Sequence, residues 1–137
     1  MTKTIFISLP VADLAASTAF YKALGFRQNT QFSDDTSACM AWSDAIQVML
    51  LTHAKWRGFT QRPFPAPGTA GHMLSLSVES REAVDAMQRA ATAHGGEADA
   101  GPEEDHGFMY SRDLADPDGH LWATFWMDPA GMPRKAA

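Results

Sequence analysis

The same order of structural signals occurs twice in this 137-residue chain, and this repetition limits the fold more than any other feature. Residues 5–9 and 73–78 are short apolar runs typical of strands, and each precedes a segment with helical spacing that ends at a glycine. Ser8 in the first run corresponds to Ser75 in the second. Such self-similarity indicates two copies of one supersecondary unit that share a hydrophobic core.

The first copy begins with the strand 5–9, which Pro10 closes, and Asp13 is placed to cap a helix. Apolar residues at helical spacing then form one stripe, and Gly25 supplies the left-handed conformation that ends many helices. The stripe consists of Ala16, Phe20, Ala23 and Leu24, and polar turns separate three strands predicted at about 26–32, 38–42 and 46–51.

The second copy repeats this order with Ser80 as the helix cap and with glycines at 95 and 96 as the stop. Its helical stripe is Val84, Met87 and Ala91, and its last strand is 121–127. Alignment of the final hairpins matches Asp44, Ile46 and Val48 with Gly119, Leu121 and Ala123. We therefore predict one domain over 1–137, with modules at about 3–52 and 72–128 and a connecting loop at about 53–71.

Composition excludes several classes of protein. The formal net charge of −5 disfavours binding to a phosphate backbone, so no nucleic-acid partner is expected. No apolar stretch approaches the ~20 residues that cross a bilayer, and the N-terminal residues lack the features of a signal peptide, so no membrane partner is expected. Cys39 is the one cysteine, which excludes an intrachain disulfide and fits a cytoplasmic protein with a buried, inert thiol.

Four short motifs resemble the vicinal oxygen chelate superfamily, which includes glyoxalase I, bleomycin-resistance proteins and extradiol dioxygenases. They are Val11-Ala12-Asp13-Leu14, Phe20-Tyr21, Leu24-Gly25-Phe26 and Asp116-Pro117-Asp118-Gly119-His120. The resemblance covers roughly residues 3–128. It implies an α+β fold in which two βαβββ modules form a cup-shaped, curved mixed sheet. It also implies pairing of modules between subunits, so we expect a homodimer.

Metal-dependent members of this superfamily hold a divalent cation with His and Glu side chains inside the cup. The resemblance places these ligand positions at Phe6, Val48, Met73 and Ala123, with Met49 as the alternative to Val48. Apolar side chains offer no lone pairs suited to such a cation, so we predict no metal and no cofactor. Strand alternation places His72 and His120 outside the cup, and a shift of one residue would instead bring them inward as an unconventional metal site.

The residues predicted to line the cup are apolar or carry small hydroxyl groups. Serines on the same face as Phe6 and Met73 favour a cavity over a filled core, because an unpaired buried hydroxyl costs on the order of 1–3 kcal/mol. Tyr110 is expected to add a polar end, and the loop residues Trp56 and Arg57 to cover the opening. The predicted ligand-binding set is Phe6, Ser8, Val48, Leu50, Trp56, Arg57, Met73, Ser75, Ser77, Tyr110, Leu121 and Ala123.

The loop 53–71 contains no acidic residue and carries Lys55, Arg57 and Arg62 in an otherwise acidic chain. A cationic, aromatic lid raises the local concentration of anions. The leading hypothesis is a metal-free pocket for a small, partly apolar organic molecule, with a preference for anions. Two alternatives remain: a metal-dependent glyoxalase-like lyase or dioxygenase with unrecognised ligands, and a non-catalytic interaction module. The sequence does not determine whether a reaction is catalysed.

Overall fold

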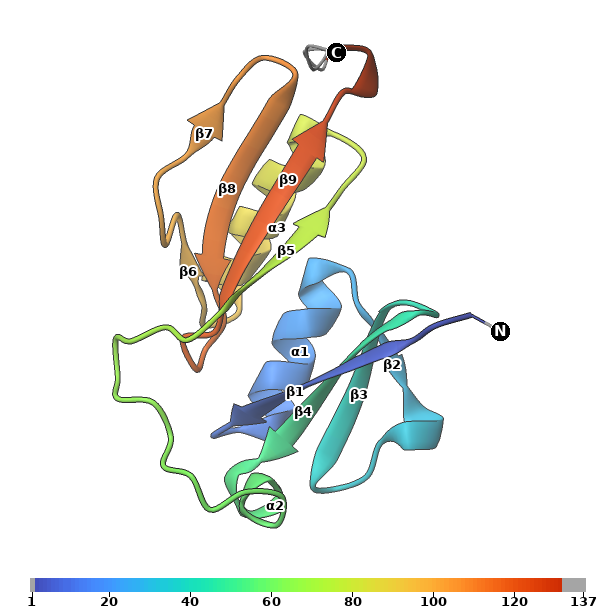
Figure 1. Ribbon diagram of the computed structural model, residues 1–137, viewed down its shortest axis with the longest axis vertical. Coiled ribbons are helices and arrows are strands. Elements are labelled where there is room, and N and C mark those ends of the chain that lie inside the picture. Colours follow the sequence, from blue (N-terminus) through green and yellow to red (C-terminus); the bar gives the residue numbers. More distant parts are fainter. Residues whose placement is uncertain (1, 132–137) are drawn as a thin grey trace, which may run out of the picture.

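The computed structural model describes residues 2–131, so Met1 and residues 132–137 of the predicted domain lie outside the described part. Two modules follow one another along the chain (Figure 1). The first consists of β1 (Ile5–Val11), α1 (Leu14–Leu24), β2 (Arg27–Asn29), β3 (Ser37–Ser43) and β4 (Ile46–Thr52). The second consists of β5 (Met73–Ser77), α3 (Arg81–Ala93), β6 (Glu97–Ala98), β7 (Glu104–Asp105), β8 (Met109–Ala115) and β9 (Leu121–Met127). A short helix α2 (His53–Arg57) opens the segment between them, and 3-10 turns lie at Thr30–Phe32 and Pro129–Gly131.

The two sheets share one topology. Their strand orders are β1-β4-β3-β2 and β5-β9-β8-β6, with β7 also paired to β8. In each sheet the first strand lies at an edge, parallel to the last strand of its module, and the remaining pairs are antiparallel. The α+β class with two βαβββ modules is therefore confirmed. The strand predicted at 26–32 is shorter than expected, because Asn29 caps a 3-10 turn that ends it.

Local signals set the helix boundaries as expected. Asp13 accepts a hydrogen bond from the Ala16 amide, and Ser80 accepts one from the Ala83 amide. These caps satisfy amides that have no partner inside the first helical turn. Gly25 ends α1 with φ of 112°, a conformation that residues with a Cβ rarely adopt.

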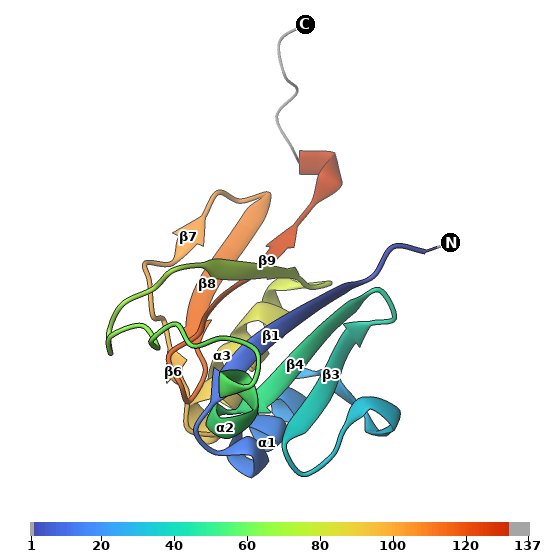
Figure 2. The ribbon, with the colours of Figure 1, turned by 60° about the horizontal axis from the view of Figure 1, so that its bottom comes forward.

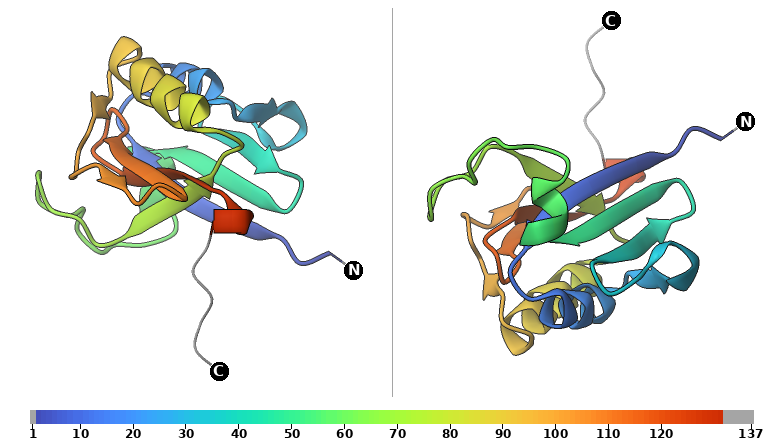
Figure 3. Two further views of the ribbon diagram at one scale, coloured as in Figure 1. Left: turned by 90° about the horizontal axis from the view of Figure 1, so that it is seen from above. Right: turned by 90° about the horizontal axis from the view of Figure 1, so that it is seen from below.

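The helices α1 and α3 lie on the same side of the molecule, and neither covers the opposite face of the sheets (Figure 3). The core lies between helices and sheets and joins both modules. Its large, fully buried members are Leu9, Val11, Phe20, Tyr21, Met40, Val48, Leu50, Val84, Leu114 and Trp122. We call the side of each sheet turned away from the helices the open face.

The predicted orientation of Val48 and Leu50 is wrong. They pair with Ile7 and Leu9, whose side chains face the helices, and both are fully buried in the core. Residues directly opposite one another in a ladder share a face, and neighbours alternate. Met49 therefore lies on the open face.

The same pairings identify the true counterpart of Ala123 in the first module. Met49 lies opposite Ser8, as Ala123 lies opposite Ser75. The alignment of the final hairpins was therefore displaced by one residue, which is enough to turn every side chain to the other face.

Tyr21 joins the two modules at the centre of the core. Its hydroxyl donates to Asp116 Oδ2 at 2.6 Å and accepts from Trp122 Nε1 at 2.9 Å. Burial is the main cause that raises the pKa of Tyr21 well above its usual value, and burial also raises the pKa of Asp116. Asp116 in turn accepts from the amides of Asp118 and His120, so it fixes the β8–β9 turn.

The prediction that Tyr110 adds a polar end to the cup is wrong, because its side chain points away from the open face. Its hydroxyl donates toward Asp85 Oδ1 at 2.6 Å and lies 2.9 Å from Glu103 Oε1, on the α3 side of β8. Arg112, on the same face of β8, forms ion pairs with Asp85 and Asp99. Burial, followed by the carboxylates of Asp85 and Glu103, raises the pKa of Tyr110. This network holds β8 against α3 and has no part in a pocket on the open face.

Two further expectations concern Cys39 and the membrane. Cys39 is buried, its thiol lies 3.3 Å from Gln47 Oε1, and burial raises the pKa of the thiol. A thiol with a raised pKa is a poor nucleophile, which agrees with the predicted inert cysteine. No helix in the described residues is long and apolar enough to cross a membrane.

Candidate functional site

The segment between the modules folds over the C-terminal end of β1. Thr52 caps α2 by accepting from the Lys55 amide, and the chain then runs in an extended path back to β5 (Figure 2). This path encloses a cavity of about 460 Å³, which is within the usual size range of small-molecule sites. Its lining residues are Ser8, Leu9, Pro10, Trp56, Thr60, Arg62, Pro63, Phe64, Pro65, Thr69, Ala70, Gly71, His72, Gly119, His120 and Leu121. We call this space the first cavity.

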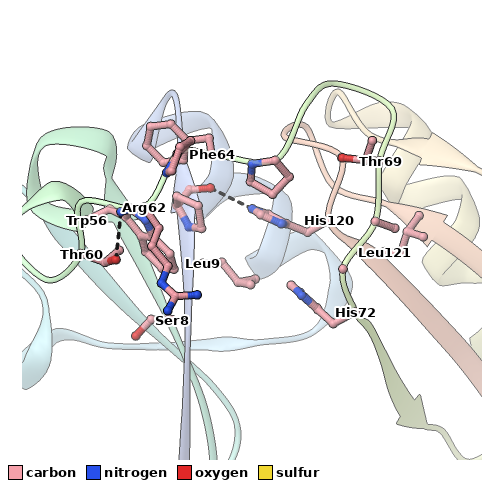
Figure 4. A pocket seen from close by; sticks show the side chains of 16 residues that line it. Ser8, Leu9, Trp56, Thr60, Arg62, Phe64, Thr69, His72, His120 and Leu121 are labelled. Carbon is pink, nitrogen blue, oxygen red and sulfur yellow. Dashed lines mark hydrogen bonds between the residues drawn. The ribbon is translucent and has the colours of Figure 1, made fainter.

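Three basic side chains line this mainly apolar space. Arg62 comes from the loop, His72 precedes β5, and His120 precedes β9 (Figure 4). The rings of the two histidines stack with centroids 6.3 Å apart, and His120 Nε2 lies 2.8 Å from the Pro10 carbonyl oxygen. No carboxylate belongs to the lining. The first cavity therefore offers apolar surface and hydrogen-bond donors suited to an anion.

The other two cations of the loop, Lys55 and Arg57, contact residues of the loop itself. The Arg57 guanidinium lies 3.9 Å from the centre of the Phe64 ring and donates to the Arg62 carbonyl, while Lys55 Nζ lies 5.6 Å from the Phe59 ring centre. Arg57 is absent from the lining, so its contact is structural, and Arg62 is the loop cation that reaches the first cavity.

The predicted binding residues separate into three groups. Ser8, Trp56 and Leu121 line the first cavity. Val48, Leu50 and Tyr110 lie on the helix side of their sheets, and Arg57 packs on Phe64. The remaining members lie on the open face outside this lining; they are Phe6, Met73, Ser75, Ser77 and Ala123.

Strand alternation gave the wrong position for both cavity histidines. His72 and His120 each lie one residue before a strand begins, where the two-residue alternation no longer fixes direction. The β8–β9 turn is the signal that could have located His120, because Asp116 accepts a hydrogen bond from the His120 amide.

The residues at the superfamily's metal-ligand positions do not fit a divalent cation. Phe6 and Met73 are apolar, and the matched pair Met49 and Ala123 offers no carboxylate. Across residues 2–131, no three His, Cys, Asp or Glu side chains come together in a group that could hold a metal ion.

Paired βαβββ modules around an open face, with a cavity at their junction, define the class of this fold. A model of the Glyoxalase/Bleomycin resistance protein/Dioxygenase superfamily matches residues 4–124. The chain belongs to this superfamily, as its motifs indicated. No protein of curated function matches the chain in sequence.

Solved structures share the fold. A hypothetical protein from S. aureus has a TM-score of 0.76 and 25% identity, covering 92% of this chain and 94% of that chain. A glyoxalase/bleomycin resistance protein/dioxygenase family enzyme from Burkholderia phytofirmans has a TM-score of 0.75 and 20% identity, covering 89% and 96%. A glyoxalase/bleomycin resistance protein from Albidiferax ferrireducens has a TM-score of 0.66 and 25% identity, covering 88% and 95%.

Proposed function

We propose that this protein binds a small, partly apolar organic anion in the first cavity and uses no metal to do so. The observation that carries the proposal is the placement of Arg62 in an apolar lining without any carboxylate. Trp56 and Leu121 supply apolar contact, and His72 adds a hydrogen-bonding group to the lining that Arg62 also reaches. A carboxylate is the simplest anion that a guanidinium recognises with two parallel hydrogen bonds.

A comparison of hexanoate with 1-hexanol tests this proposal, because the two differ only in the charged group. Calorimetry should show that hexanoate binds at least about tenfold more tightly, since hydrogen bonds to a charged group contribute about 1.5–3 kcal/mol. Arg62→Gln should remove this preference, and added salt should weaken the binding of hexanoate alone. Lys3→Gln removes an exposed charge outside the cavity and serves as the control. Equal binding of acid and alcohol to the unmodified protein would refute an anion site.

The absence of metal dependence has its own test. Calorimetric titration with zinc, nickel, iron(II) and manganese should show no one-to-one binding tighter than micromolar, because Phe6, Met73, Met49 and Ala123 cannot act as ligands for these cations. The protein is purified without affinity chelators and dialysed against a chelator before titration. A stoichiometric nanomolar isotherm with any of the four metals would disprove the metal-free site.

We also propose that the protein forms a homodimer through its open faces. Phe6 is 52% exposed and Met73 is 50% exposed, and they lie on the free edge strands β1 and β5. Neither strand carries a charged residue, and the one proline, Pro10, lies at the C-terminal end of β1, so most of each edge lacks the charges, prolines or bulges that usually protect the exposed edges of monomers. A second copy is the commonest way to cover such a surface.

Sedimentation at tens of micromolar should give about twice the chain mass of 14.9 kDa. Phe6→Glu combined with Met73→Glu should convert the dimer to a folded monomer, because it buries two carboxylates in the contact. Lys3→Glu changes charge nearby outside the two strands and should leave the dimer intact. A 14.9 kDa species for the unmodified protein at these concentrations would contradict the proposal.

A further inference from the structure

A second cavity of about 530 Å³ adjoins the first. Both are bounded by the end of β1, the proline-rich part of the loop and the start of β9. Their shared lining is Pro10, Phe64, Pro65, Thr69, Ala70, Gly119, His120 and Leu121. The two cavities therefore adjoin along His120 and Leu121, and a ligand that occupies both would lie against these two residues.

The charged residues of the two cavities have opposite signs. Arg62 belongs to the first lining alone, whereas Glu97 and Asp118 belong to the second alone, whose described lining contains no lysine or arginine. Across residues 2–131, none of these three side chains takes part in an ion pair. The two adjoining cavities thus carry a cation on one side and two carboxylates on the other, and no ion pair among the described residues neutralises them.

The sheet and the β8–β9 turn fix the acidic end. Glu97 on β6 pairs with Ala115, and Ala115 pairs with Leu121, so the three residues form one row on the open face. Two strand spacings place the Cα atoms of Glu97 and Leu121 about 10 Å apart. Asp118 accepts from the Ala12 amide at 2.8 Å and from Ser17 Oγ at 3.3 Å, which holds its carboxylate in place. A carboxylate has about four lone-pair sites, so Asp118 can still accept from a ligand.

We infer that the natural ligand is zwitterionic, with a carboxylate at the Arg62 end and an ammonium group at the Glu97 and Asp118 end. This inference rests on the proposed function, because it takes the anion site as the first anchor. A simple anion would leave the acidic end unused and would meet its repulsion. An amino carboxylate with a linear apolar middle matches both ends and the apolar surface of Leu121 between them.

Matched probes test this directly with the full chain. Calorimetry compares 6-aminohexanoate with hexanoate and hexylamine, and a series from 4-aminobutyrate to 8-aminooctanoate samples the spacing of the charges. We expect one length of amino carboxylate to bind at least about tenfold more tightly than both the acid and the amine of equal length. Glu97→Gln should reduce its affinity to that of the simple acid and leave the affinity of hexanoate equal or higher. Glu82→Gln, a carboxylate lost outside both cavities, is the control.

The outcomes separate the two proposals. Tight binding of hexanoate without any gain from the amino group would refute the zwitterion and leave the anion site standing. Binding of neither hexanoate nor any amino carboxylate would refute both. An amino carboxylate whose affinity is unchanged in Glu97→Gln and in Asp118→Asn would also overturn the inference, because its ammonium group would then lie elsewhere.

Discussion

Tyr21→Phe is expected to lower the free energy of unfolding by about 2–4 kcal/mol, because one buried hydroxyl serves two partners from the other module. The variant leaves the Trp122 indole N–H without an acceptor and removes the donor at 2.6 Å from Asp116. Urea denaturation followed by tryptophan fluorescence measures the change. The same substitution at Tyr110 is the matched control. Its hydroxyl lies among carboxylates that also bind Arg112 and reach solvent, so a smaller loss is expected.

The pH dependence of stability gives a second readout of the same hydroxyl. Burial and Asp116 raise the pKa of Tyr21, so the folded chain keeps this proton above pH 10, whereas the unfolded chain releases it. The unfolded state then binds fewer protons, and the free energy of unfolding falls by up to about 1.4 kcal/mol per pH unit above pH 10. Tyr21→Phe should lack this contribution. The contrary result is a Tyr21→Phe variant that is as stable as the parent at pH 7 and shows the same fall in the free energy of unfolding above pH 10. That result would show that the Tyr21 hydroxyl does not join the modules.

Gly96→Ala is expected to lower the free energy of unfolding by about 3 kcal/mol through overpacking. A Cβ at Gly96 would overlap the carbonyl oxygen of Ala115 and lie 2.5 Å from the Phe20 ring. The Ala115 carbonyl is fixed by the pairing of β6 with β8, and the Phe20 ring is buried on α1 of the first module. An added Cβ would therefore strain the sheet and push α1 away from the second module. Thermal and urea denaturation of the variant measure the loss.

Gly71→Ala provides the comparison for this substitution. A Cβ at Gly71 would meet no atom within 4 Å, so its stability should change by no more than about 0.5 kcal/mol. Equal stability of Gly96→Ala and Gly71→Ala would show that the contact between α1 and the second module is loose.

The junction that these substitutions probe also builds the candidate site. Asp116 binds Tyr21 in the core and the amides of the turn that carries Asp118 and His120. The rigidity of the turn thus comes from the core, and it fixes the positions of Asp118 and His120 at the two cavities. We therefore expect core variants at Tyr21 to weaken ligand binding as well as stability.

Residues close in the chain determined much of this protein by themselves. Asp13 and Ser80 cap helices, Gly25 ends one, and the repeated order of elements gives two βαβββ modules, because each signal depends on contacts within a few residues. The side-chain chemistry of Phe6 and Met73 argues against a metal in the same way, because neither residue offers a suitable ligand atom in any fold. The caps and the glycine stop follow from hydrogen bonds and backbone geometry that every chain of this local sequence shares.

Only the tertiary structure decided which faces and which distant residues form the site. Val48 and Met49 are both apolar, so no local signal selects the one that faces the core; pairing with β1 does. His72 and His120 line the same cavity as Arg62 because a loop returns over the end of β1, and neither strand alternation nor spacing encodes that path. A shift of one residue reverses every side chain of a strand, and contacts between residues far apart in the chain are what fix that register.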